Sequence, residues 1–392
     1  MRSKLFGHGA NDLYWFILPL VLPSLLVRYD LSYTQAGGIL TIYLAVAAIG
    51  SFIMGKLSDR FSRKNILSSG FILASVGLMA SGFASSLSVF LLLISITAVG
   101  VSTFHPVMYA IIDENYTTNK GRVLGIYEGF GTGAILMMFL INGSLIRWIG
   151  IRGILILTAM PALIMGLIYH FTSAIPVEIH KKASHKNNKT NGGGSDILRF
   201  NLFLISVVLR MLSVAAILNF LPTIFVNFFG YGENIAAYGT AFYFVGGILG
   251  SLTAGKISDR FNSLVIMIVA TILIALSIFI LSLNLPVWIY PVSIILLGGV
   301  ASGCLINQNL MLTRLGAHMG RGEVFGVMMG VMTITASLSP TLFGMTIDYA
   351  GFNQALLIFT LPLLLSIVIL IFLLKFDTTK VGRIIETLPA QE

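Results

Sequence analysis

Apolar stretches of about 20 residues recur from one end of the chain to the other, separated by short polar or glycine-containing segments. A stretch of this length crosses the hydrocarbon core of a bilayer as a single α-helix. The pattern predicts twelve membrane-spanning helices, six before a long polar segment and six after it. The first six are expected near residues 9–28, 37–55, 66–85, 88–111, 123–143 and 150–172. The second six are expected near residues 201–225, 235–255, 264–284, 287–312, 322–344 and 352–374.

The polar segment between the two sets contains the run EIHKKASHKNNKTNGGGSD. Its basic, glycine-rich composition is typical of a flexible linker. We therefore expect an all-α membrane protein made of an N-terminal six-helix bundle (1–180), a cytoplasmic linker (181–198) and a C-terminal six-helix bundle (199–392).

Composition and charge support a multi-pass membrane protein. Hydrophobic residues make up 56% of the chain and charged residues 10%, against about 25% charged in soluble domains. With both termini and the linker in the cytoplasm, roughly 20 of the 24 Lys and Arg lie on that side. This asymmetry predicts a protein of the cytoplasmic (plasma) membrane with both termini inside. The net charge of +9 then faces anionic lipid headgroups, and no nucleic-acid partner is needed to explain it.

Several classes of function are disfavoured by motifs that the sequence lacks. There is no P-loop, no HExxH and no cysteine pair, because Cys304 is the single cysteine. The run GFGTG is not a dinucleotide fingerprint, since no strand precedes it. We therefore expect no enzymatic activity, no cofactor and no metal.

The two halves of the chain repeat each other. GKLSDRF at 55–61 returns as GKISDRF at 255–261, and GSLIRWIG at 143–150 aligns with GMTIDYAG at 344–351. Six spans followed by six more in the same order indicate two parallel repeats, which can rock against each other around a site between them.

The loop GKLSDRFSRK (55–64) resembles the signature loop of the Major Facilitator Superfamily, and its second copy loses only the basic pair. The resemblance covers the whole chain and implies the fold of that family, with two six-helix bundles related by a pseudo-two-fold axis along the membrane normal. In the family this loop is regarded as a conformational latch. That role is carried over to Gly55, Asp59, Arg60, Arg63, Gly255, Asp259 and Arg260, with Gly55 expected to allow a tight turn beside a neighbouring helix. The alternative is a solvated basic loop.

Two shorter motifs resemble the fosmidomycin-resistance branch of that family, a set of drug exporters. They are H-x-x-N-D-L-Y-x-x-x-L-P, from His8 to Pro19, and F-H-P at 104–106. The run GVMTITASLSPTLFG at 330–344 is also similar to the eleventh span of that branch.

Ionisable side chains inside the predicted spans are the main site candidates, because such groups are costly in hydrocarbon. His8 and Asp12 share a helix face with Trp15, and the family resemblance implies that this face lines a central cavity. The alternative is that His8 and Asp12 cap the helix in the headgroup region. His105 precedes Pro106, which favours a kink, and its side chain titrates near neutral pH.

Arg210 is predicted near the middle of the seventh span, where it either holds an anionic substrate or pairs with Asp12 or Glu128 as structure. Glu128 lies beside Gly125, Gly129 and Gly133, a spacing that favours close helix packing. The remaining candidates for substrate contact are polar or aromatic residues of the first and tenth spans: Asn11, Tyr14, Trp15, Asn307 and Gln308.

These expectations combine into a secondary active transporter that works by alternating access as a monomer and carries a small-molecule substrate, with protons as the coupling ion. The resemblance to drug exporters implies proton-coupled efflux of a drug-like or anionic compound. Proton-coupled uptake of a small organic anion is the alternative. A non-transporting membrane receptor or a lipid-handling protein is the alternative of another class.

Overall fold

The computed structural model describes residues 2–58, 60–115, 120–172, 194–283, 285–316 and 321–386. The N-terminal helices are α1 (Arg2–Arg28), α2 (Tyr33–Leu57), α3 (Arg63–Ser81), α4 (Leu87–Ser102), α5 (Phe104–Asn115) and α6 (Lys120–Phe171). The C-terminal helices are α7 (Gly194–Thr223), α8 (Glu233–Ser258), α9 (Ser263–Ser282), α10 (Ile289–Leu315), α11 (Arg321–Ile358) and α12 (Leu361–Glu386). A short π-helix, Ile224–Phe228, extends α7.

Helices cover all twelve predicted spans, although the helix boundaries differ from the span boundaries. The fourth span is divided between α4 and α5 at Thr103, next to the kink predicted from Pro106. Helix α6 contains the fifth and sixth predicted spans, whereas α11 contains the eleventh span and the start of the twelfth, which continues as α12. α7 begins at Gly194, inside the range assigned to the linker; residues 173–193 lie outside the described part of the chain. Nine helical segments of the described residues are long and apolar enough to cross a membrane, two of them with 49 and 51 residues.

The two long helices are broken at equivalent glycines. Gly150 in α6 has φ 60° and Gly351 in α11 has φ 82°, a region that residues with a Cβ rarely adopt. These are the last residues of the two aligned repeats GSLIRWIG and GMTIDYAG. Both breaks lie where the apolar pattern of the sequence predicts a boundary between two spans, near residues 143–150 and 344–352.

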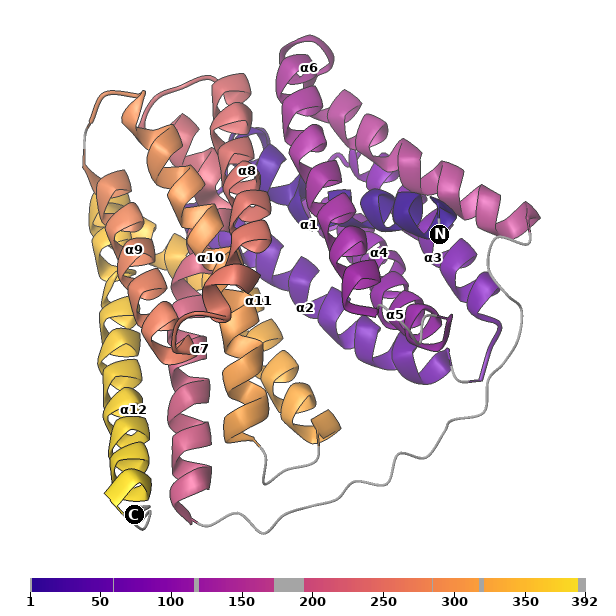
Figure 1. Ribbon diagram of the computed structural model, residues 1–392. Coiled ribbons are helices and arrows are strands. Elements are labelled where there is room, and N and C mark those ends of the chain that lie inside the picture. The colour runs from indigo at the N-terminus through magenta and orange to yellow at the C-terminus, as the bar shows by residue number, and fades with distance from the viewer. Residues whose placement is uncertain are drawn as a thin grey trace.

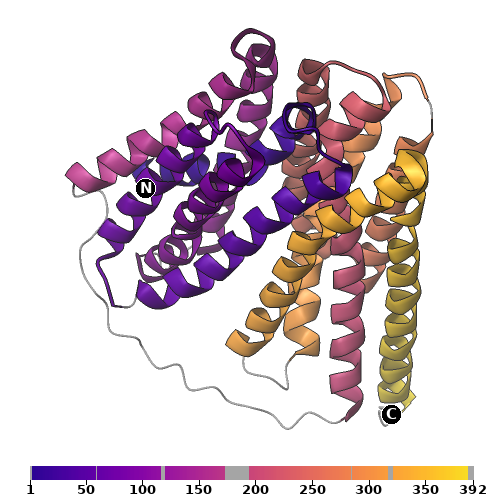
Figure 2. The ribbon, with the colours of Figure 1, turned by 180° about the vertical axis from the view of Figure 1, so that it is seen from behind.

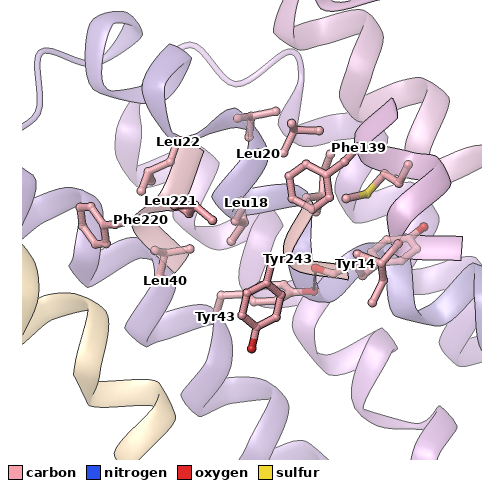
Figure 3. Packing of buried hydrophobic residues seen from close by; sticks show 14 of the residues in the cluster. Tyr14, Leu18, Leu20, Leu22, Leu40, Tyr43, Phe139, Phe220, Leu221 and Tyr243 are labelled. Atoms are coloured by element: carbon pink, nitrogen blue, oxygen red, sulfur yellow. Dashed lines mark hydrogen bonds between the residues drawn. The ribbon is translucent and has the colours of Figure 1, made fainter. Parts of the chain in front are cut away.

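The helices form two bundles that meet at one end and diverge toward the other (Figures 1 and 2). We call the diverging end, where α2 and α8 end, the signature-loop end, and the other the opposite end. The core continues across the junction of the bundles: Leu18 and Leu22 of α1 cluster with Phe220 and Leu221 of α7 (Figure 3), and all four are fully buried. The predicted fold, two six-helix bundles, is confirmed.

Hydrogen bonds between α2 and α11 hold the opposite end together. The Thr41 hydroxyl donates to the Ser337 carbonyl at 2.6 Å and lies 2.7 Å from the Thr341 hydroxyl. The backbone N–H groups of Tyr33 and Thr34 donate to the Asp348 carboxylate at 3.0 and 2.8 Å. Asp348 of one bundle therefore caps a helix of the other.

A second set of contacts joins α1 and α6 to α8 at the same end. The Ser144 and Tyr238 hydroxyls are 2.8 Å apart, and Ser24 donates to the Glu233 carboxylate. The Phe16 and Phe244 rings pack edge to face with centroids 5.0 Å apart. These contacts close the space between the bundles at the opposite end.

The negative charge of Asp348 is expected to stabilise this closure. Partial burial opposes its ionisation, but hydrogen bonds from Thr34, Tyr33 and Ser32 outweigh burial and lower the pKa of Asp348 below 3.8. A lowered pKa means that the stabilisation is complete above the ordinary value and is lost as the pH falls through the lowered one. Asp348→Asn should weaken closure by about 1 kcal/mol, roughly a fivefold shift toward opening.

Spin labels on cysteines introduced at Asp30 and Tyr349, both exposed, would report this shift as a longer distance at the opposite end. Cys304 is buried and should not be labelled. Asp196→Asn removes a carboxylate at the signature-loop end and should leave the distance unchanged. An unchanged distance in Asp348→Asn would show that the carboxylate does not hold the bundles together.

The signature loops do not show the tight turn that was expected. Gly55 lies in the last turn of α2, and a Cβ added there would meet the Cβ of Pro106 at 3.6 Å, an ordinary contact, while Gly255 faces open space. Arg63 is buried, whereas Arg60, Asp259 and Arg260 are exposed, and Asp59 lies outside the described residues. The bundles diverge at this end, so the latch stays a prediction for the conformation in which it closes.

Candidate functional site

The first candidate site is built on α1, which is longer than the sequence predicted. The helix begins at Arg2, so Asp12 lies ten residues, about 15 Å, from its start. Asp12 therefore cannot cap the helix, and its side chain is 12% exposed. His8 lies one turn earlier on the same face and is fully buried.

The His8 ring is held by α6. Its Nδ1–H donates to the backbone carbonyl of Tyr127 at 2.8 Å, and the two rings stack with centroids 3.8 Å apart. In the neutral ring this hydrogen bond leaves the lone pair on Nε2, which lies 3.2 Å from the Asp12 carboxylate.

His105 reaches the same carboxylate from the start of α5. Its Nε2 lies 3.3 Å from Asp12 Oδ1, and the His105 side chain is 25% exposed. The amide of Asn11 donates to this nitrogen at 3.2 Å. Helices α1, α5 and α6 thus bring His8, Asp12 and His105 together, which we call the Asp12 cluster.

A glycine of α6 makes room for this cluster. A Cβ added to Gly131 would overlap the Asp12 carboxylate and lie 2.7 Å from Cε1 of His8. Gly131→Ala should therefore displace the carboxylate and destabilise the fold by about 1 kcal/mol or more, as overpacking does. Thermal unfolding of the purified protein would measure the loss.

Gly133→Ala is the matched control for Gly131→Ala, since nothing lies within 4 Å of a Cβ added there. In a helix interior this exchange should be neutral or stabilising by up to about 1 kcal/mol. Equal unfolding temperatures for the two variants would mean that the Asp12 carboxylate moves aside without cost.

Gly125, Gly129 and Gly133 do not form the close helix contact that their spacing suggested. Nothing lies within 4 Å of a Cβ added to any of them. Glu128, beside them, accepts a hydrogen bond from the Tyr109 hydroxyl, and the Tyr109 ring stacks on His105 with centroids 5.7 Å apart. Glu128 therefore connects to the Asp12 cluster through Tyr109.

The two aromatic candidates of α1 lie in different surroundings. Tyr14 is fully buried, and its hydroxyl bonds to Ser75 at 3.2 Å, so it packs inside the N-terminal bundle. Trp15 is half-buried and lies against His105 with ring centroids 6.0 Å apart. The Trp15 indole N–H has no hydrogen-bond partner, which leaves a donor beside the cluster.

The second candidate site surrounds Arg210 in the C-terminal bundle. The residue is 6% exposed, and its Nη2 donates to the Gln308 amide oxygen on α10. Its Nη1 has no hydrogen-bond partner, nor does either amide atom of Asn307, which is fully buried. Asp12 and Glu128 bind the groups described above, so within the described residues Arg210 has no carboxylate partner. We call Arg210, Asn307 and Gln308 the Arg210 site.

Two apolar cavities lie elsewhere. One of about 610 Å³ lies between α8, α9 and α10, and one of about 660 Å³ between α1 and α6. Asn307 lines the first, but neither is lined by Asp12, His105 or Arg210. The charged groups therefore do not open into these cavities.

Three residues of the first site escaped sequence reasoning: Tyr109, Tyr127 and Gly131. Tyr127 acts through its backbone carbonyl, which leaves no signal in the residue type. Tyr109 lies one turn after His105, and that spacing could have identified it.

Comparisons with known proteins show that the chain is similar to membrane transporters. The sequence profile described as the Major Facilitator Superfamily matches residues 5–320 and 203–389. The benzoate transport protein of Acinetobacter baylyi is 22% identical over 369 residues, which cover 84% of this chain and 78% of the relative. The gentisate transporter of Corynebacterium glutamicum is 25% identical over 375 residues, covering 92% and 83%. A crystal structure of the nucleoside transporter NupG superposes with a TM-score of 0.78 at 13% identity, covering 95% of this chain and 98% of that one.

Proposed function

Because the chain belongs to the Major Facilitator Superfamily and is thereby a membrane transporter that works by alternating access, we propose that its substrate is a small organic anion and that protons drive its movement. An aromatic carboxylate is the leading substrate class, since two relatives that align over most of this chain are named for benzoate and gentisate.

The observation that carries the proposal is that Arg210 has no carboxylate partner among the residues that the structure describes. A guanidinium buried near the middle of a membrane helix almost always pairs with another group, yet Nη1 lacks a partner. A carboxylate accepts two parallel hydrogen bonds from a guanidinium, and Asn307 offers a further unpaired amide on the neighbouring helix. A carboxylate substrate would satisfy both residues.

The arrangement of the bundles agrees with alternating access. Contacts such as Thr41 with Thr341 close the opposite end, and the bundles diverge at the signature-loop end. With the proposed orientation, both termini in the cytoplasm, this is an inward-facing conformation. A substrate at Arg210 would then leave toward the cytoplasm.

Coupling to protons is proposed for the Asp12 cluster. Among the described residues the ion partners of Asp12 are the two histidines, and a histidine is positively charged only when it is protonated. The carboxylate is therefore neutralised by protons rather than by a permanent cation. Glu128 and Tyr109 extend the cluster and are proposed to pass the proton on.

We propose uptake as the direction of transport, by symport of the anion with a proton. Export by antiport is the second candidate, favoured by the motif from His8 to Pro19 that resembles exporters of the fosmidomycin-resistance branch. Proteoliposomes can be loaded and diluted to impose a pH gradient of either sign. The movement of labelled benzoate across their membrane would then distinguish symport from antiport. Accumulation that follows inward proton flow supports symport, accumulation against it supports antiport, and failure to transport any aromatic or aliphatic carboxylate would contradict the proposal.

A further inference from the structure

The Asp12 cluster has the geometry of a metal site as well as of a proton site. One ligand atom from each of His8, Asp12 and His105 lies within 4.8 Å of the other two. The distances from the carboxylate to the two Nε2 atoms are 3.2 and 3.3 Å. Ligands at about 2.0–2.1 Å from a tetrahedral Zn²⁺ are separated by roughly 3.3 Å. Each histidine is therefore at that distance from one carboxylate oxygen, His8 Nε2 from Oδ2 and His105 Nε2 from Oδ1.

Both histidines of the cluster can offer a ring nitrogen lone pair to a cation. His8 uses its Nδ1–H for the Tyr127 carbonyl, so its Nε2 presents a lone pair to the carboxylate. His105 Nε2 accepts from the Asn11 amide, so it also carries a lone pair, which becomes available to a metal ion once that amide is displaced. The His8 lone pair and the carboxylate repel each other unless a proton or another cation lies between them. Accordingly His8 Nε2 and Asp12 Oδ1 are buried without a hydrogen-bond partner.

The surroundings of His8 match those of a metal-binding histidine. Such a histidine almost always donates its second ring N–H to a carbonyl or carboxylate, which fixes the tautomer and the ring orientation. The Tyr127 carbonyl does this, and the Tyr127 ring stacks on the imidazole. The 25% exposure of the His105 side chain provides a route of entry.

We infer that His8, Asp12 and His105 bind one divalent transition-metal ion, with Zn²⁺ as the best match. Two imidazoles and one carboxylate suit Zn²⁺ and exclude Ca²⁺ or Mg²⁺, which prefer oxygen ligands. Three protein ligands leave a fourth position for water. The Asn11 amide gives up its hydrogen bond to His105 when the metal binds.

A bound metal ion would also stop transport, and this part rests on the proposed function. The ion would occupy the place of the coupling proton, and its ligands come from α1 and α5 of one bundle. Zn²⁺ should therefore inhibit proton-driven uptake of the substrate, whereas Mg²⁺ should not.

The test uses the full chain, purified in detergent with any histidine tag removed, and Zn²⁺ itself as the probe. Equilibrium dialysis should give one Zn²⁺ per chain, and Co²⁺ should bind with the absorption spectrum of a nitrogen- and oxygen-ligated ion. His105→Gln and Asp12→Asn should weaken Zn²⁺ binding by at least about tenfold, because loss of even an outer partner costs that much. His170→Gln, which removes an exposed histidine at the end of α6, is the control.

His105→Gln is the primary variant, because its partly exposed side chain can be changed without opening the core around His8. Unchanged Zn²⁺ affinity in both cluster variants, or no Zn²⁺ bound by the wild type, would overturn the inference. Zn²⁺ that binds at the cluster but leaves transport unaffected would confirm the metal site and instead contradict the coupling role proposed for Asp12.

Discussion

Arg210→Ala should abolish binding of aromatic carboxylates. Removing one partner of a buried, hydrogen-bonded charge pair costs about 2–5 kcal/mol, which is a loss of affinity of about 30-fold or more. Arg210→Lys keeps the charge but cannot form two parallel hydrogen bonds, so its affinity should lie between those of the wild type and the alanine variant. Thermal shifts of the purified protein with increasing benzoate would measure all three, because a ligand that binds the folded state raises its stability.

The stability of the ligand-free protein distinguishes a residue that binds the substrate from one that stabilises the fold. A buried charge without a counter-charge is costly, so Arg210→Met should not lower the unfolding temperature when no substrate is present. Arg199→Ala is the control: this arginine of the same helix lies 3.9 Å from Asp196 near the signature-loop end, and benzoate should still shift its unfolding temperature. If Arg210→Met lowers the unfolding temperature but keeps the shift caused by benzoate, Arg210 is structural.

The fold could be predicted in detail because its signals are local in the sequence. The length of an apolar run determines whether it spans a membrane, and the span boundaries near 143–150 and 344–352 enclose the glycines at which two helices break. Helix starts were less accurate, since α1 runs seven residues further back than the hydropathy indicated. Lys4 and His8 are polar but buried, and packing against other helices of the bundle is not visible in a one-dimensional profile.

The candidate site was predicted only in part, for a physical reason. Helical spacing placed His8 and Asp12 on one face, and the kink at Pro106 drew attention to His105. In α6 the close helix contact was assigned to Gly125, Gly129 and Gly133, because spacing alone does not say which glycine faces a neighbouring helix. Gly131 adjoins Asp12 while Gly129 faces open space, a difference that depends on the rotation of α6.

Asp12→Asn should uncouple transport from the proton gradient without preventing substrate exchange. Asparagine has the size of aspartate and can hydrogen-bond to His8 and His105, but it cannot take up and release a proton. If one proton accompanies each anion, a gradient of one pH unit sustains up to about tenfold accumulation in the wild type, since tenfold corresponds to about 1.4 kcal/mol. The variant should accumulate no more benzoate than liposomes without protein, while it continues to exchange labelled for unlabelled benzoate faster than those liposomes.

Asp30→Asn is the matched control for this experiment. Asp30 carries the same charge in the turn after α1 and is exposed, and its left-handed backbone, with φ 49°, is one that asparagine adopts readily. Its removal should leave accumulation at the wild-type level. Accumulation that persists in Asp12→Asn would place the coupling proton elsewhere, and Glu128 would be the next candidate because Tyr109 links it to His105. Loss of both accumulation and exchange would instead mean that the Asp12 carboxylate is needed to move the bundles, because exchange requires alternating access but no net transfer of protons.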